Sequence, residues 1–451
     1  MVHPSSRNSN PTPDRGANVN FSRRSFLKVA GAGVGALALP SFAWRGLFAQ
    51  EAAAATRSLV VIYLRGGADA LNIVVPFADS RYYELRPSIA IAPEAGGDGA
   101  PVIKLDKQFG LHPSLGALKP HFDAARFAPL VCTGSPHTTR SHFDAQDFME
   151  YGAPGSRTVR DGWLNRYLSA TNKAAGIDAS RLRAVAMQSL LPRSLRGEYP
   201  VLAVPDDKVL NDGKLIDLFD DVYKDGDKKE GEKKSGEKKD APKDMMGERR
   251  EEDSVTQTGK DTVETLKRYK EILKRPIEGK RATFGVDKFG RAMRDIAACI
   301  RANVGLEVAS VDVGGWDDHV NEGGAEGALA QRLKTLGDNL AAFLEDLGPR
   351  AESTLVYVMT EFGRTCKENG NEGTDHGHGG CAFLLGGKVK GGKVHGQWSG
   401  LAEKDLYQKR DLPVTTDYRD VFATVLAQHM KFEVPKGFFP DYTPKAVAGL
   451  F

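Results

Sequence analysis

The sequence has 451 residues, of which 41% are hydrophobic, so the chain can bury a large core as one big domain or two smaller ones. Its 62 Lys and Arg residues nearly balance its 59 Asp and Glu residues, which leaves a formal net charge of +3. A nucleic-acid-binding face needs clustered basic residues with little acidic dilution, so this composition argues against a nucleic-acid partner.

Residues 1–55 are interpreted as an export signal with a flexible N-terminus. Arg23 and Arg24 precede a mild Gly, Ala and Leu run at 29–40, which is too short to span a bilayer. The pattern resembles the signal that the twin-arginine translocase reads. Small residues at Ala43, Ala49 and 52–55 offer cleavage points, so we expect the mature chain to begin between Trp44 and Thr56. No Cys follows the apolar run to carry a lipid anchor. We therefore expect an exported protein of the periplasm or cell envelope, with no stable membrane span in the mature chain.

Short apolar runs predict the strands of a sheet. In chain order these runs lie at 59–64, 128–133, 182–187, 306–311, 355–359 and 382–385. Helical patterns lie between or after them, at 112–122, from 141, at 163–168, at 289–300, at 329–344 and at 417–429. Alternating apolar strands and helices predict an α/β fold, here a three-layer α/β/α sandwich around a mostly parallel sheet.

The domain at 56–451 contains one compositional break, at 224–253. This segment carries nearly equal numbers of basic and acidic residues and almost nothing apolar apart from Met245 and Met246. It cannot bury enough apolar surface to offset the entropy lost on ordering, so we predict a disordered insertion.

The four cysteines form no CxxC pair and no zinc-ribbon spacing. They are Cys132, Cys299, Cys366 and Cys381. Because twin-arginine cargo leaves the cytoplasm folded, we expect four buried thiols, with the last two the only pair near enough in sequence to suspect a bridge.

Acidic residues stand where three of the predicted strands end. Asp69 follows the glycine turn after the first strand, Asp312 ends the fourth and Glu361 ends the fifth. The carboxyl ends of strands in an open parallel sheet are where ligands bind, so these carboxylates are candidate metal ligands. For Asp69, a turn-capping role is an equal alternative.

Imidazoles and a further carboxylate follow in two loops. His319 closes the sequence DVGGWDDH, and Asp375, His376 and His378 lie in a glycine-rich loop where the backbone can be approached closely. Mixed carboxylate and imidazole ligands suit Zn, Mn or Fe and are too rich in histidine for a typical calcium cage. A divalent ion held there would polarise an ester oxygen and steady an attacking oxygen.

Ser141 is the candidate nucleophile. With Asp144 three residues later it forms a capping box that would start a helix, placing its hydroxyl where a phosphate or sulfate can bind. From spacing alone a plain N-cap is at least as good a reading. His137 and His142 flank this serine; His142 is a second catalytic candidate, although a lone histidine there more often has a structural role.

Six motifs together resemble the DUF1501 family over roughly residues 56 to 445. They are RGGADALN, TRSHFDAQDFMEYG, RDGWLNRYL, DVGGWDDH, TEFGRT and TDHGHGG. The fold of this family belongs with the alkaline phosphatase and sulfatase superfamily. The resemblance implies that Ser141 is the nucleophile, that Asp312 and His319 are metal ligands, and that His376 is the late histidine of the metal site.

The chain departs from the superfamily pattern at two ligand positions. Arg65 stands where an Asp is usual, so Asp69 would have to reach the metal from the following turn. Glu361 stands where the superfamily has the Asp of an Asp-His pair, and Phe362 replaces the His; an alternative alignment uses Asp375 and His376 as this pair. The number of metal ions at the site, one or two, therefore remains open. The sulfatase modification motif is absent, which argues against a formylglycine sulfatase.

Two functions follow from these patterns. The first is an exported, metal-dependent hydrolase that acts on a phosphate or sulfate ester. The second is a non-catalytic binding or cell-envelope assembly protein that keeps the scaffold with a degraded metal site. The survival of Ser141, Asp312, His319 and His376 favours the hydrolase.

Overall fold

The computed structural model describes residues 56–95, 99–175, 182–204, 263–275 and 282–451. The predicted export signal and the charged insertion at 224–253 lie outside these residues.

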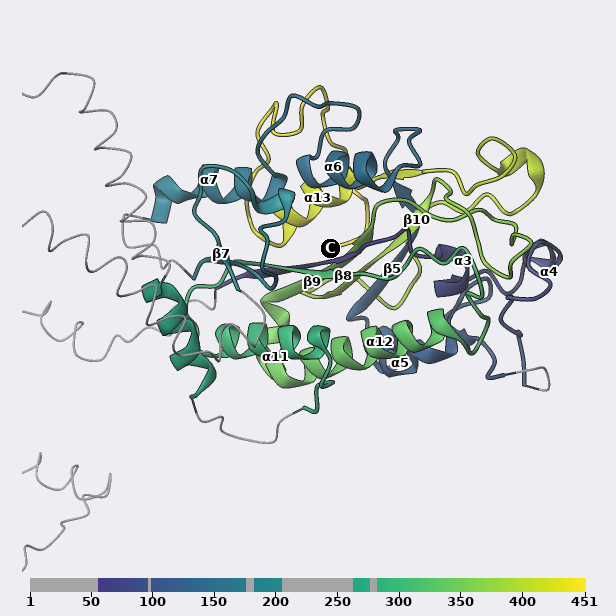
Figure 1. The fold of residues 1–451 in the computed structure, drawn as a ribbon, viewed down its shortest axis with the longest axis horizontal. Helices are drawn as coiled ribbons and strands as arrows, with labels where there is room; N and C mark the ends of the chain where they lie inside the picture. Colours follow the sequence, from purple (N-terminus) through teal and green to yellow (C-terminus); the bar gives the residue numbers. More distant parts are fainter. Residues whose placement is uncertain (1–55, 96–98, 176–181, 205–262, 276–281) are drawn as a thin grey trace, which may run out of the picture. The chain divides into compact units, whose positions relative to one another are not determined.

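An eight-stranded sheet forms the centre of the fold, with the strand order β11-β5-β10-β9-β1-β8-β6-β7 (Figure 1). Strand β10 runs antiparallel to β5 and β9, whereas the other neighbours pair in parallel. The mostly parallel sheet predicted from the sequence is therefore confirmed. Its strands are β1 (Ser58–Leu64), β5 (Phe127–Gly134), β6 (Ala184–Ala186), β7 (Leu202–Ala203), β8 (Val308–Val313), β9 (Thr354–Thr360), β10 (Gly380–Gly386) and β11 (Thr416–Asp417).

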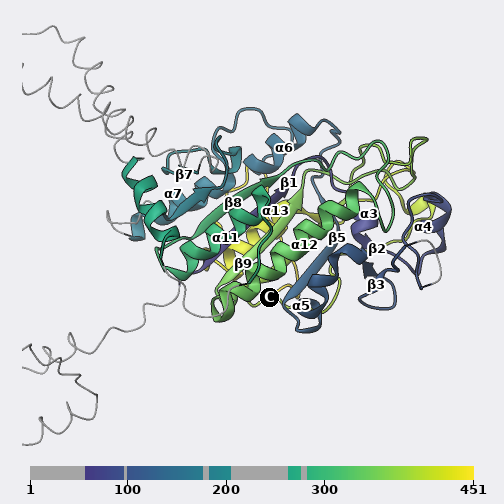
Figure 2. The ribbon, with the colours of Figure 1, turned by 60° about the horizontal axis from the view of Figure 1, so that its bottom comes forward.

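Helices cover both faces of this sheet (Figures 1 and 2). One face carries α5 (Lys119–Asp123), α11 (Lys288–Arg301) and α12 (Ala328–Leu347). The other carries α6 (His142–Tyr151), α7 (Trp163–Ala175) and α13 (Tyr418–Gln428). The three-layer α/β/α sandwich is thus confirmed.

The first strand shows why its sequence is apolar throughout. Val60, Ile62 and Leu64 pack in the core beneath α11 and α12, whereas Leu59 and Val61 pack in the core beneath α7 and α13. Successive side chains of a strand point to opposite faces, so a strand covered on both faces must be apolar at every position.

The remaining elements are short. A second sheet, ordered β2-β4-β3, joins β2 (Val74–Val75), β3 (Ile103–Lys104) and β4 (Gly110–Leu111). The short helices are α3 (Ala70–Ile73), α4 (Ser80–Leu85), η1 (Pro113–Leu118), η2 (Arg193–Leu195), η3 (Gly348–Glu352) and η4 (Glu403–Asp405), and a further helix spans 263–273. None of the helices in the described part of the chain is long and apolar enough to cross a membrane. All four cysteines are buried, free thiols.

The carboxyl ends of β1, β5, β8 and β9 meet at one edge of the sheet. Strands β9, β1 and β8 are parallel neighbours, and β5 runs in the same direction because both strands are antiparallel to β10. The loops at 65–69, 135–141, 314–327 and 361–379 leave this edge, and they carry the polar residues singled out in the sequence.

Candidate metal centre

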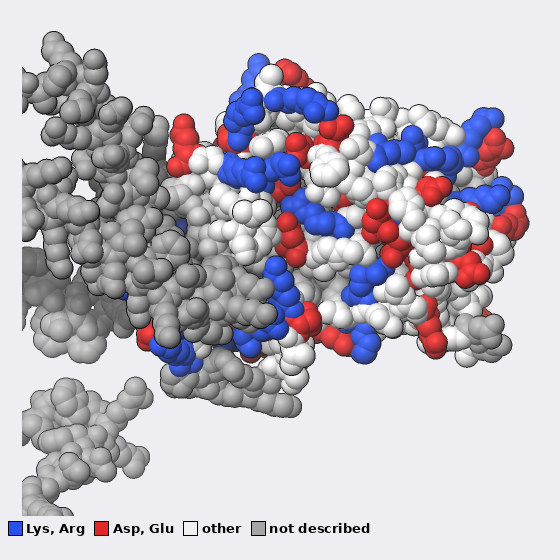
Figure 3. Space-filling model, viewed as in Figure 1, with Lys and Arg blue, Asp and Glu red and all other residues white. Residues whose placement is uncertain are grey.

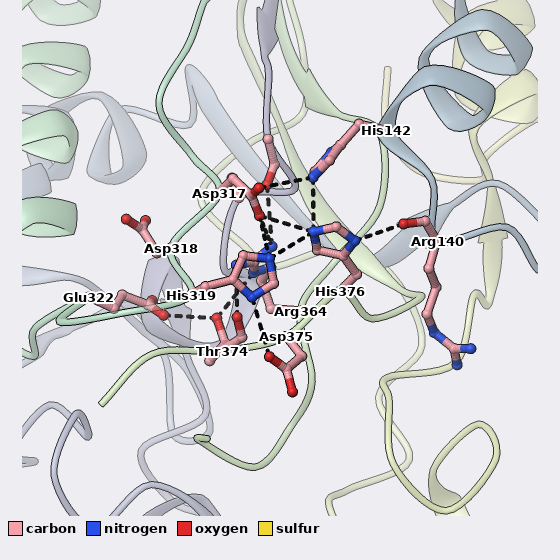
Figure 4. Close-up of polar contacts among 12 residues, drawn as sticks. Arg140, His142, Asp317, Asp318, His319, Glu322, Arg364, Thr374, Asp375 and His376 are labelled. Carbon is pink, nitrogen blue, oxygen red and sulfur yellow. Dashed lines mark hydrogen bonds and ion pairs between the residues drawn. The ribbon is translucent and has the colours of Figure 1, made fainter. Parts of the chain in front are cut away.

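Three histidines and one aspartate converge at this edge (Figure 4). His376 Nε2 lies 2.9 Å from both His142 Nε2 and His319 Nε2. The Asp317 carboxylate lies 3.0 Å from the Nε2 atoms of His319 and His376 and 3.3 Å from that of His142. We call these four residues the ligand cluster; His142, Asp317 and His376 offer ligand atoms that all lie within 4.8 Å of one another.

The other ring nitrogen of each histidine faces an acceptor. These acceptors are Glu361 Oε1 for His142 at 2.8 Å, the Arg140 carbonyl for His376 at 2.7 Å and Asp375 Oδ1 for His319 at 3.2 Å. A carbonyl or an ionised carboxylate can only accept, so each Nδ1 carries the proton. In the neutral form of each ring, Nε2 then turns a lone pair toward the cluster, which is the arrangement of histidines oriented to bind a metal; in the cationic form Nε2 would donate to Asp317 instead.

The pKa shifts of the cluster residues differ in direction. Burial and the neighbouring His142 lower the pKa of His376, which favours its neutral, metal-binding form. The hydrogen bond to Glu361 raises the pKa of His142, which favours its cationic form when no cation is bound beside it. Burial would raise the pKa of Asp317, but the hydrogen bond and charge of Arg364 dominate and bring it down to about 2. Asp317 is therefore an anion that faces three imidazole nitrogens.

Three of these residues, His142, Asp317 and His376, fit one divalent cation, because their ligand atoms all lie within 4.8 Å of one another. His319 borders this group through its contacts with His376 and Asp317. Metal–nitrogen bonds of about 2.0–2.1 Å bring ligand atoms to separations of about 3–4 Å. Imidazoles combined with a carboxylate suit Zn, Mn or Fe. The side chains stay 22% exposed in His142, 24% in His376, 40% in His319 and 43% in Asp317. Solvent or a substrate can therefore reach the cluster, whereas structural zinc sites are closed.

Two buried residues hold the ligands in place. Arg364 Nη1 donates to Asp317 Oδ1 at 2.7 Å, and its other nitrogens donate to Thr374. Glu361 is fully buried, and its Oε1 accepts from His142, from Gln146 and from the Gly66 amide. Glu361, predicted as a ligand, thus lies behind His142 and orients it.

Gly66 allows this close packing. Its φ of 131° is a conformation that side-chain-bearing residues rarely adopt, and an added Cβ would lie 2.6 Å from the Asp317 amide nitrogen. The glycine turn after β1 therefore lets the loop that carries Asp317 lie directly against it.

Asp312 lies outside the ligand cluster, contrary to the prediction. Arg65 Nη2 donates to both of its oxygens, at 3.0 and 2.9 Å, and Arg65 Nη1 donates to Glu150 at 2.9 Å. Asp317, five residues later in the same loop, takes the position expected for Asp312. The guanidinium of Arg65 therefore occupies the carboxylates next to the cluster, and the residues that converge fit one ion rather than two.

Asp69 and His378 also lie apart from the cluster. Asp69 is buried, and both of its oxygens accept from Arg86. His378 is buried with its ring stacked on that of Tyr407, the centroids 4.1 Å apart. Asp69 is therefore not placed to bind the metal from the turn after β1, because Arg86 holds it in the interior.

Ser141 borders the cluster through the main chain. It is the N-cap of α6 and is exposed, but its side chain makes no capping hydrogen bond, so the predicted capping box is wrong. Asp144 instead accepts from Arg157 at 2.7 Å. Ser141 lies between Arg140, whose carbonyl orients His376, and the ligand His142.

Asp317 and Arg364 are not predicted from the sequence, although both stand inside the motifs DVGGWDDH and TEFGRT. The paired aspartates before His319 are the available signal for Asp317, whereas nothing in the spacing distinguishes Arg364 from a surface arginine.

No curated protein matches the chain at a significant level. The model of DUF1501, described as a protein of unknown function, matches residues 56–437. This match covers most of the chain, so the protein belongs to the DUF1501 family.

Proposed function

We propose that the protein is an exported, metal-dependent hydrolase of a phosphate or sulfate ester. The observation that carries this proposal is the ligand cluster, in which three histidines with their Nδ1 protons committed elsewhere turn Nε2 toward Asp317. A divalent ion held there would act as a Lewis acid on an ester oxygen. The resemblance to alkaline phosphatases and sulfatases, read from the motifs, supports the same chemistry.

One arginine beside the cluster favours an anionic substrate. The Arg410 guanidinium donates to the His376 carbonyl at 2.7 Å and also pairs with Asp411. Arg140 contacts His376 only through its carbonyl, whereas its guanidinium points away from the cluster and pairs with the same Asp411 (Figure 4). A partly exposed guanidinium such as that of Arg410 attracts phosphate and sulfate groups.

Lysine, arginine and acidic side chains are interspersed over the face drawn in Figure 3. This mixed surface matches the nearly balanced composition. An anionic substrate would therefore be attracted by the guanidinium of Arg410 beside the cluster rather than by a general basic surface.

Ser141 supplies the proposed nucleophile. Its exposed hydroxyl stands at the start of α6, next to the ligand His142. Since His142 turns its Nε2 toward the cluster, we assign it to metal binding and not to proton transfer from the serine.

The experiment is a paired measurement of metal content and of turnover of an aryl phosphate and an aryl sulfate. Ser141→Ala should keep the metal and lose turnover, while Ser156→Ala, in the loop after α6, should keep both. Full turnover in Ser141→Ala would mean that a water molecule, and not Ser141, attacks the ester. Wild-type protein with neither bound metal nor turnover would favour the binding or assembly protein.

Export belongs to this proposal and rests on Arg23 and Arg24, which lie outside the described residues. Replacing both with Lys should leave the protein in the cytoplasm, since the translocase reads the arginine pair. Unchanged export of the variant would refute the twin-arginine interpretation.

A further inference from the structure

A cavity of about 490 Å³ lies between the N-terminal parts of α11 and α12 and the end of β8. Much of its wall is apolar and comes from Met187, Phe289, Ala292, Val311 and Leu336. Its volume falls in the range of about 300–1,000 Å³ that is usual for small-molecule sites. None of the four residues of the ligand cluster lines this cavity.

Two features connect the cavity with the ligand cluster. The end of β8, at Asp312, and the loop after it, at Gly314, form one wall of the cavity. This loop continues to the ligand Asp317. Arg332 lines the cavity and also pairs with Asp318, the residue next to that ligand. A molecule in the cavity would therefore touch the same loop that positions the cluster.

Four exposed apolar residues lie close in sequence to the cluster or to the cavity wall. They are Phe143, Leu190, Val286 and Val320, at 81%, 79%, 90% and 57%, the most exposed large hydrophobic residues within the described ranges. Phe143 and Val320 each directly follow a histidine of the cluster, and the other two lie within three residues of the cavity wall.

We infer that the ester substrate carries an apolar alkyl or aryl group, which occupies this cavity while the anionic group lies at the ligand cluster. The inference rests on the proposed hydrolase function and adds the substrate class to it. Burying the apolar group would supply binding energy, and the guanidinium of Arg410 beside His376 would hold the charged end.

The test is a binding series of n-alkyl phosphates of increasing chain length, kept below their critical micelle concentrations and measured by calorimetry on the metal-loaded protein. Affinity should rise about threefold to fourfold per buried methylene until the cavity is full. An affinity that does not change with chain length would overturn the inference.

Variants on α12 locate the effect. Thr335→Phe fills the cavity from its wall and should abolish the dependence on chain length, while Lys334→Phe, on the exposed side of the same helix, should retain it. If Thr335→Phe fails to fold by circular dichroism, Gly314→Leu replaces it, since a Cβ at Gly314 meets no atom within 4 Å. If a folded variant with a filled cavity still shows the dependence of affinity on chain length, the alkyl group of the probe binds elsewhere.

A variant that loses the metal tests the cavity assignment separately from the proposed hydrolase function on which it rests. In Asp317→Asn, alkyl phosphates should bind more weakly, whereas alkyl alcohols, which need only the cavity, should bind as before. Equal binding of both probes with and without the metal would show an apolar cavity independent of the ester site and would overturn the link. Chain-length-dependent binding without any hydrolysis would sink the hydrolase proposal and leave the cavity assignment standing.

Discussion

Glu361 accepts a hydrogen bond from His142 Nδ1 at 2.8 Å, and this contact decides which nitrogen of His142 faces the ligand cluster. The two residues stand 219 positions apart, at the end of β9 and the start of α6. Glu361 is buried, yet its pKa lies below its ordinary value: burial would raise it, but the hydrogen bonds from His142 and Gln146 outweigh burial. The carboxylate therefore stays ionised as a fixed acceptor.

Replacing Glu361 with Gln should weaken metal binding by about 10–100-fold, the usual loss when the partner behind a ligating histidine is changed. Asp375→Asn is the matched comparison, since it alters the partner of His319. Its carboxylate is exposed and lies 3.2 Å from the ring, so the loss should be smaller. Competition with a chromophoric chelator measures both constants, and equal effects would contradict the assigned role of Glu361.

Variants of Asp312, at the end of β8, and of Asp317, in the loop after it, should differ in metal binding. Asp317→Asn removes the only carboxylate of the ligand cluster and should abolish stoichiometric metal binding. Asp312→Asn breaks the pair with Arg65 and should keep the metal. Elemental analysis after dialysis distinguishes them, and metal loss in the Asp312 variant alone would restore the assignment made from the sequence.

The sequence predicts the fold well because burial leaves a direct signal. Strands covered on both faces are continuously apolar, as at 59–64 and 355–359, and both appear in the central sheet. The reversed direction of β10 has no such signal, since a strand buried on both faces looks the same in either direction.

The site is only partly predictable for a different reason. Residue type shows that ligands are present, but the path of the loop decides which of them meet. Asp312 ends its strand as predicted, yet Arg65 meets it there, and the chain runs on through Gly314 and Gly315 before Asp317 turns into the cluster. His376 and His378 stand two residues apart in one loop, and only the first faces the cluster.

The buried pair of Asp69 and Glu322 gives a prediction about stability. Burial and the nearby Asp69 raise the pKa of Glu322 well above its ordinary value, which favours its protonated form. Burial alone would also raise the pKa of Asp69, but the charge of Arg86 holds it below its ordinary value. We therefore expect one carboxyl of the pair to be neutral and the other ionised.

Glu322→Gln should change the free energy of unfolding by about 1 kcal/mol or less, because an amide can still donate to Asp69 and accept from Thr374. Asp69→Asn should cost about 3–5 kcal/mol, because it leaves the guanidinium of Arg86 buried without its counter-ion. Urea unfolding at neutral pH compares the two, and a larger loss in the Glu322 variant would mean that Glu322 is ionised.

His429 should make the folded state less stable in mild acid. It is buried at the end of α13, where its Nε2 donates to the Ser58 carbonyl at 3.0 Å, and burial lowers its pKa from 6.5 to about 4. As the pH falls below 6.5, the unfolded chain takes up this proton while the folded chain does not, so the free energy of unfolding decreases until about pH 4. The contribution lost over this window is about 3 kcal/mol. The test is the variant His429→Gln, which keeps a donor for Ser58 and removes the titrating group. Urea unfolding measures the free energy of unfolding of wild type and variant at pH 7 and at pH 4. The difference between the two proteins should change by about 3 kcal/mol between these pH values. A difference that stays constant with pH would show that His429 takes up its proton equally in both states.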